Sequence, residues 1–89
     1  MIFEWDEGKR NANLVRHGID FPDAALLFDG RPVITVPSPF EDEERFLTVG
    51  VLDRRFMTAV WTWRGDAIRI ISARRSRDDE KKRYHALFA

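Results

Sequence analysis

Residues Arg64–Arg75 read R-G-D-A-I-R-I-I-S-A-R-R, an apolar β-strand pattern that is interrupted and flanked by arginines. The three isoleucines predict a buried strand over Ala67–Ala73. Guanidinium groups are always charged, and each presents a planar fork of donors that matches a phosphate group. Several guanidinium groups on one strand and its flanks repel one another, which is unfavourable unless a bound anion offsets their charge. The segment therefore indicates a surface that handles RNA.

Alternating apolar residues predict four further strands, which are Ile2–Trp5, Val33–Val36, Arg45–Leu52 and Phe56–Trp63. The pairs Asp53-Arg54 and Gly65-Asp66 are turn sequences, so they are expected to join the last three strands as hairpins. Pro37 and Pro39 place the strand before them at an edge of the sheet, because proline has no N–H to donate. An acidic loop, Phe40–Glu44, follows this edge strand.

Two helices are predicted between the first two strands. Asp6 is a suitable N-cap for a helix that runs to about His17, and Gly18 supplies the residue that closes it. A second helix runs from Asp20 to Gly30. The residues expected to face the core are Ala12, Leu14 and Val15 in the first helix and Ala24, Ala25, Leu27 and Phe28 in the second.

A last helix is predicted from Arg77 to about Phe88, where Ser76 and Asp79 resemble a capping box. Its expected apolar stripe consists of Tyr84, Leu87 and Phe88. The order of elements is then β-α-α-β-β-β-β-α, which predicts a single α+β domain over residues 1–89 with a small, mainly antiparallel sheet. Large aromatic residues in so small a domain are mostly core, so Trp61 and Trp63 are expected to be buried.

The net charge of zero conceals a division along the chain. Residues 1–53 hold five Lys and Arg against eleven Asp and Glu, whereas residues 54–89 hold ten against four. Segregated charge is typical of a basic face for nucleic acid, and the alternative is that both halves interleave in space and neutralise each other. The chain has no cysteine, which excludes disulfides and thiolate metal sites. No signal peptide and no membrane-length apolar run is recognised, so we expect a cytoplasmic protein.

Two segments resemble BrnT-type ribonuclease toxins of bacterial type II toxin–antitoxin pairs. They are F-E-W-D-E-G-K-R-N-A-N-L-V-R-H-G-I-D-F-P-D-A (Phe3–Ala24) and the Arg64–Arg75 segment with the later Tyr84. The resemblance implies a RelE-like fold and metal-independent RNA cleavage. It also implies an antitoxin of ribbon-helix-helix type, through which the complex binds operator DNA. The family pattern commonly has Lys before the His-Gly pair, where this chain has Arg16, which cannot act as a proton shuttle near neutral pH.

RNA cleavage without a metal must activate the 2′-hydroxyl, stabilise a phosphorane and protonate the departing 5′-oxygen. The residues expected to carry catalysis are Arg64, Arg74, His17 and Glu44. The residues expected to bind RNA are Lys9, Arg69, Arg75 and Arg45, and no metal or cofactor is expected.

Each candidate also has a simpler interpretation. The arginines can form surface ion pairs, His17 can serve helix termination, Glu44 can belong to a solvated loop, and Lys9 can serve solubility. In a regular strand, the odd spacing of Arg69 and Arg74 would place them on opposite faces. Three functions stay open: an endoribonuclease toxin, a module that assembles an antitoxin–operator repressor complex, and a basic RNA-binding domain. If the endoribonuclease interpretation is correct, Arg64→Ala or Arg74→Ala should abolish growth inhibition and leave the fold intact.

Overall fold

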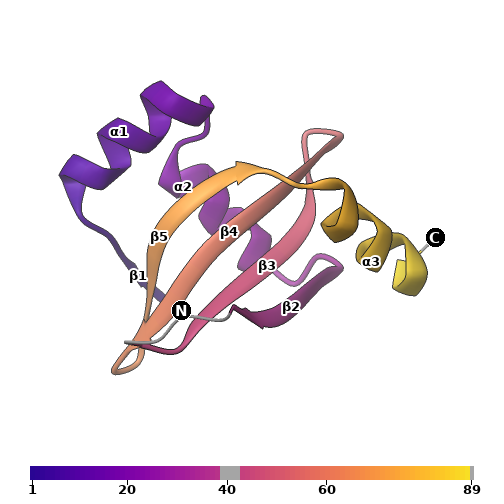
Figure 1. Ribbon diagram of the computed structural model, residues 1–89. Helices are drawn as coiled ribbons and strands as arrows, with labels where there is room; N and C mark the ends of the chain where they lie inside the picture. The colour runs from indigo at the N-terminus through magenta and orange to yellow at the C-terminus, as the bar shows by residue number, and fades with distance from the viewer. Residues whose placement is uncertain (39–42, 89) are drawn as a thin grey trace.

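The chain forms one five-stranded sheet with three α-helices around it (Figure 1). The computed structural model describes residues 1–38 and 43–88, so most of the predicted loop Phe40–Glu44 lies outside the described residues. The elements in chain order are β1 (Ile2–Glu4), α1 (Glu7–His17), α2 (Phe21–Ala24), the 3₁₀ helix η1 (Ala25–Phe28), β2 (Val33–Ser38), β3 (Arg45–Leu52), β4 (Arg55–Arg64), β5 (Ala67–Arg75) and α3 (Asp78–Phe88).

The strand order across the sheet is β1-β5-β4-β3-β2. Strands β2 to β5 form an antiparallel meander, and β1 pairs in parallel with the start of β5. The prediction of an α+β fold with a mainly antiparallel sheet is therefore confirmed. The prediction that the proline-containing strand lies at an edge is also confirmed, because β2 ends the sheet.

The helical segment after Asp20 covers one face of the sheet, which we call the helix face. The predicted single helix is divided, because α2 ends at Ala24 and continues as the tighter 3₁₀ turn η1. Phe21 and Leu27 are the largest side chains that this segment buries, and they join Ala59, Trp61 and Ile70 in the core.

Trp61 is buried as expected, but the prediction for Trp63 is wrong. Trp63 is 51% exposed, although its ring contacts the edge of Trp61 with centroids 5.3 Å apart. The cover provided by η1 ends at Phe28, which packs on Trp61, so the next residue along that face is left open.

Strand β5 contains a β-bulge that changes which side chains share a face. Trp61 pairs with Ile70 and Val60 pairs with Ser72, so Ile71 is the extra residue. Because of this extra residue, Arg69 opposes Thr62 and Arg74 opposes Thr58, two positions of β4 that lie on the same face. The expectation of opposite faces for Arg69 and Arg74 is therefore wrong, because it assumed a regular strand.

Helix α3 begins one residue later than predicted and uses a different acid to cap its start. Glu80, not Asp79, accepts a hydrogen bond from the backbone N–H of Arg77, at 2.8 Å. The predicted apolar stripe is only partly used, because Leu87 is 70% exposed and Phe88 is also exposed, whereas Tyr84 packs on Phe56.

The β3–β4 hairpin turns through two residues that both have positive φ, Asp53 at 51° and Arg54 at 65°. This is the type I′ geometry, in which glycine is preferred at the second position. We expect Arg54→Gly to raise the free energy of unfolding by about 0.5–1 kcal/mol, because the left-handed conformation is unfavourable for a residue with a Cβ. Urea unfolding measures the change, and Arg55→Gly, in the strand itself, should lower stability instead.

Candidate functional site

Four of the eight candidate residues lie on the sheet face opposite the helix face. Arg69 and Arg74 reach this face through the bulge, and Arg64 reaches it from the last position of β4. Arg45 lies there too, because the next residue of its strand, Phe46, pairs with Trp61 on the helix face. We call this surface the arginine face. Arg75 pairs with Met57 and is therefore on the helix face, apart from the other four.

Each cation of the arginine face has a carboxylate partner. Arg69 pairs with Glu4 at 3.0 Å, and Arg74 pairs with Glu80 at 2.8 Å. Glu43 lies 3.0 Å from Arg45 and 4.0 Å from Arg64, whose side chain is 55% exposed. Glu4 and Glu43 belong to the acidic half of the chain, so the two halves interleave at this face. The face is consequently less positive than the segregated charge predicts.

Three basic residues without such partners lie beside it, in a hollow between α1 and β5. The α1–β5 hollow has a volume of about 190 Å³ and is lined by Lys9, Ala12, Asn13, Arg16, His17, Ile71 and Ser72. Over residues 1–38 and 43–88, no carboxylate pairs with the side chain of Lys9, Arg16 or His17. Ser72 and Arg74 both point to the arginine face, because they oppose Val60 and Thr58 of one β4 face. The hollow therefore borders that face.

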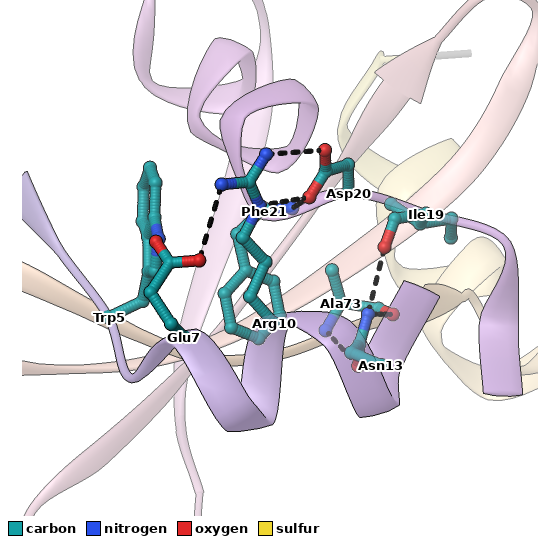
Figure 2. Close-up of polar contacts among 8 residues, drawn as sticks. All are labelled: Trp5, Glu7, Arg10, Asn13, Ile19, Asp20, Phe21 and Ala73. Carbon is teal, nitrogen blue, oxygen red and sulfur yellow. Dashed lines mark hydrogen bonds and ion pairs between the residues drawn. The ribbon is translucent and has the colours of Figure 1, made fainter. Parts of the chain in front are cut away.

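Asn13 is one of the residues that line the hollow, and it fixes α1 against β5. Figure 2 shows its hydrogen bonds to Ala73 and Ile19. Its Nδ2 donates to the carbonyl oxygens of Ala73 at 2.9 Å and Ile19 at 3.0 Å, and its Oδ1 accepts from the N–H of Ala73 at 3.2 Å. Strand β1 pairs only with the first residues of β5, up to Arg69. At Ala73 the side-chain amide of Asn13 makes the backbone hydrogen bonds that a neighbouring strand would make. Sequence reasoning missed Asn13, although an amide between the apolar residues Ala12 and Leu14 of a predicted helix was a signal.

The packing of α1 corrects the predicted apolar face of this helix. Val15 is 90% exposed, and Leu14 and Ala12 are exposed as well. Arg10 provides the second attachment, because its guanidinium donates to both carboxylate oxygens of Asp20 at 2.7 and 3.0 Å, which lowers the pKa of Asp20 (Figure 2). Polar bonds, and not an apolar stripe, hold α1 in place.

Replacing Asn13 with aspartate should show how much this amide contributes. The carboxylate of Asn13→Asp cannot donate to the carbonyls of Ala73 and Ile19, and it is buried without a cation. We expect the free energy of unfolding to fall by about 2–4 kcal/mol. Urea unfolding at pH 7 measures the effect. Asn11→Asp, at an exposed position of the same helix, should change stability by less than about 0.5 kcal/mol.

The Arg74–Glu80 pair anchors α3 to the sheet. The guanidinium donates two hydrogen bonds to the carboxylate, at 2.8 and 2.9 Å, and the Glu80 side chain is only 8% exposed. Burial alone would raise the pKa of Glu80, but hydrogen bonds from Arg74, the Arg77 N–H and Thr58 outweigh it and lower the pKa to about 2. Both terminal nitrogens of the Arg74 guanidinium therefore donate to a structural partner.

The lowered pKa of Glu80 predicts a pH dependence of stability. A carboxyl group whose pKa is about 2 when folded and 4.5 when unfolded stabilises the fold above pH 4.5. That contribution should be lost as the pH falls from 4.5 towards 2. Urea unfolding of the wild type and of Glu80→Gln should differ most at pH 7, and the two should converge near pH 2. A difference that stays constant over this range would contradict the prediction.

The structure separates Glu44 from His17. The backbone oxygen of Glu44 accepts a hydrogen bond from Thr62, so it lies where β3 begins. His17 lies beside Ile71 and Ser72 on β5. Strand β4 runs between these positions, so about 10 Å or more separates them. Among the described residues, no group of three or more His, Asp or Glu side chains could hold a metal ion, and no helix is long and apolar enough to cross a membrane.

A small α+β domain with a cationic hollow beside an arginine-bearing sheet face defines a protein suited to a polyanionic ligand. Residues 5–80 match the family model of the ribonuclease toxin BrnT of type II toxin–antitoxin systems, and the chain belongs to this family. The resemblance seen in the sequence is thereby confirmed. Comparison with curated proteins gives no significant match. Membership makes the chain a toxin whose target is RNA and whose partner is an antitoxin.

Proposed function

We propose that this toxin is a metal-independent endoribonuclease that holds the scissile phosphate in the α1–β5 hollow. The observation that supports the proposal is that two cations, Lys9 and Arg16, and the imidazole of His17 line this hollow without a carboxylate partner in the described chain. A concave site with unpaired cations attracts an anion, whereas the paired arginines nearby are already neutralised. RNA fits because the family is one of ribonucleases.

His17 is proposed as the proton carrier of the reaction, since histidine titrates near neutral pH. The 2′-oxygen forms a bond to phosphorus, the bond from phosphorus to the 5′-oxygen breaks, and the 2′-hydroxyl proton passes through His17 to the 5′-oxygen. The products are a 2′,3′-cyclic phosphate and a 5′-hydroxyl. Lys9 and Arg16 hold the phosphoryl oxygens and stabilise the charge of the phosphorane.

The remaining candidates receive supporting roles in this proposal. Arg64 is the most exposed cation of the arginine face, and it is proposed to contact phosphates that flank the cleaved bond. Arg69 and Arg45 contribute weaker contacts because their carboxylate partners compete with RNA. Arg74 is proposed as a structural residue. Arg75 and Glu44 lie away from the hollow and receive no catalytic role.

The test is RNA cleavage by the purified chain in excess EDTA. The proposal predicts cleavage of an RNA oligonucleotide to a 2′,3′-cyclic phosphate end, and no cleavage of the same sequence with a 2′-deoxy sugar at the cut. Loss of cleavage in EDTA that Mg²⁺ restores would contradict metal independence. Intact RNA in every condition, with the antitoxin still bound, would favour the alternative of a module that assembles a repressor complex.

The antitoxin is proposed to be of ribbon-helix-helix type and to bring the complex to operator DNA. The support is family membership, since a type II toxin is neutralised by a protein partner. Sedimentation of the complex with and without operator DNA tests this proposal. An antitoxin that binds the toxin but no operator fragment would contradict it.

A further inference from the structure

An apolar groove lies at the edge of the sheet that is farthest from the hollow. The β2–α3 groove has a volume of about 480 Å³ and is lined by Val33, Ile34, Thr35, Val36, Arg83, Ala86 and Leu87. One wall is β2, the edge strand, and the other is the C-terminal half of α3. Figure 1 shows these two elements on the same side of the molecule. Leu87 is 70% exposed and Phe88 follows it, so α3 presents apolar surface that the described chain does not cover.

The edge of β2 is able to pair with another strand. Proline is tolerated inside a strand where its nitrogen points away from the neighbouring strand, so Pro37 indicates that odd-numbered residues of β2 direct their N–H groups outwards. The 2.9 Å contact between the hydroxyls of Thr35 and Thr48 fits this register, because side chains approach closest in pairs that exchange no backbone hydrogen bonds. Val33 and Thr35 therefore offer backbone donors and acceptors along the groove.

The charges around the groove select its occupant. Arg83 is the one charged residue among those that line it, and Lys82 precedes it on the same exposed helix. A second copy of the chain is disfavoured, because β2 (Val33–Ser38) carries no carboxylate that could meet Arg83 in a β2–β2 pairing. RNA is disfavoured because the walls are mainly apolar. An extended protein segment with alternating apolar side chains and an acidic residue fits both features.

We propose that this groove binds an extended acidic segment of the antitoxin, which adds to β2 as a sixth strand. Its apolar side chains rest on Ala86 and Leu87, and its carboxylate pairs with Arg83. The proposal rests on the antitoxin partner that family membership supplies, and it does not depend on how RNA is cleaved. Strands β3 and β4 separate the groove from β5, so the added strand anchors the antitoxin without covering the α1–β5 hollow.

The experiment measures antitoxin affinity by calorimetry, with the full chain and the antitoxin from the same operon. Leu87→Asp and Arg83→Glu should each weaken binding by at least about tenfold, because the groove loses an apolar wall or its cation. The matched control is Val15→Asp, which introduces the same acid at the 90% exposed position of α1 and should bind like the wild type. RNA cleavage by all three variants should equal that of the wild type, which shows that they are folded.

Amide hydrogen exchange provides a second measurement that needs no variant. Binding of the antitoxin should slow exchange at Val33 and Thr35, whose N–H groups are proposed to pair with the added strand. Unchanged affinity of both groove variants, or unchanged exchange along β2, would overturn the proposal. Loss of self-association in the variants would indicate that a second copy of the chain occupies the groove. Loss of RNA cleavage without loss of antitoxin affinity would indicate that RNA occupies it. Either result would also overturn the proposal. Absence of cleavage in the wild type would reject the proposed reaction and leave the affinity comparison valid.

Discussion

RNA cleavage by His17→Asn is expected to be about 10²–10⁴-fold slower than cleavage by the wild type, which is the usual contribution of a positioned proton carrier. Asparagine keeps a polar group of similar size at the last position of α1, before Gly18, but it cannot take or deliver a proton near neutral pH. The affinity for a 2′-deoxy oligonucleotide should change by less than about threefold, because Lys9 and Arg16 still bind phosphate. Single-turnover cleavage and fluorescence anisotropy measure the two quantities.

The matched control for this prediction is His85→Asn. His85 is exposed on α3, packs its ring on Phe56 and lies outside the α1–β5 hollow. This variant should cleave RNA like the wild type. If His17→Asn kept full activity, helix termination would be the whole role of His17 and the proposed proton path would be wrong. If both variants lost activity equally, the loss would reflect a general effect of removing a histidine.

Elements with strong local signals could be predicted from the sequence. Asp6 caps α1 through its side chain and Gly18 closes it with φ at 71°, as their residue types indicate. The hairpin turn at Asp53-Arg54 and the edge position of β2 were likewise predictable, because turn chemistry and proline act within a few residues. The family resemblance was visible in two such segments, Phe3–Ala24 and Arg64–Arg75, and the family model covers residues 5–80.

Features that depend on contacts between distant residues could not be predicted. No residue type in Arg64–Arg75 indicates that Ile71 is the unpaired residue of a β-bulge. This bulge nevertheless determines that Arg69 and Arg74 lie on the same face of the sheet. The partner of Arg69 is Glu4, 65 residues earlier in the chain, and only the parallel pairing of β1 with β5 brings them together. The sequence therefore supplied candidate cations but could not say which of them pair with carboxylates.

Arg74→Met is expected to lower the free energy of unfolding by about 3–5 kcal/mol, the cost of leaving a buried carboxylate without its cation. The carboxylate of Glu80 would keep its bonds from Thr58 and from the Arg77 N–H, which do not neutralise its charge. A domain of this size would lose about 10 °C or more in melting temperature. This result differs from the one that the sequence predicts, in which a change at Arg74 removes toxicity and leaves the fold intact.

A double-mutant cycle separates the structural role of Arg74 from a catalytic one. Glu80→Gln keeps an acceptor for Thr58 and Arg77 but carries no charge, so Arg74→Met/Glu80→Gln should be more stable than Arg74→Met alone by about 2 kcal/mol or more. The control is Arg69→Met, whose partner Glu4 is 40% exposed, and it should cost less than about 1 kcal/mol. If cleavage recovers together with stability in the double variant, Arg74 acts on RNA only by holding α3 on the sheet. A stable double variant that stays inactive would instead return Arg74 to the catalytic group.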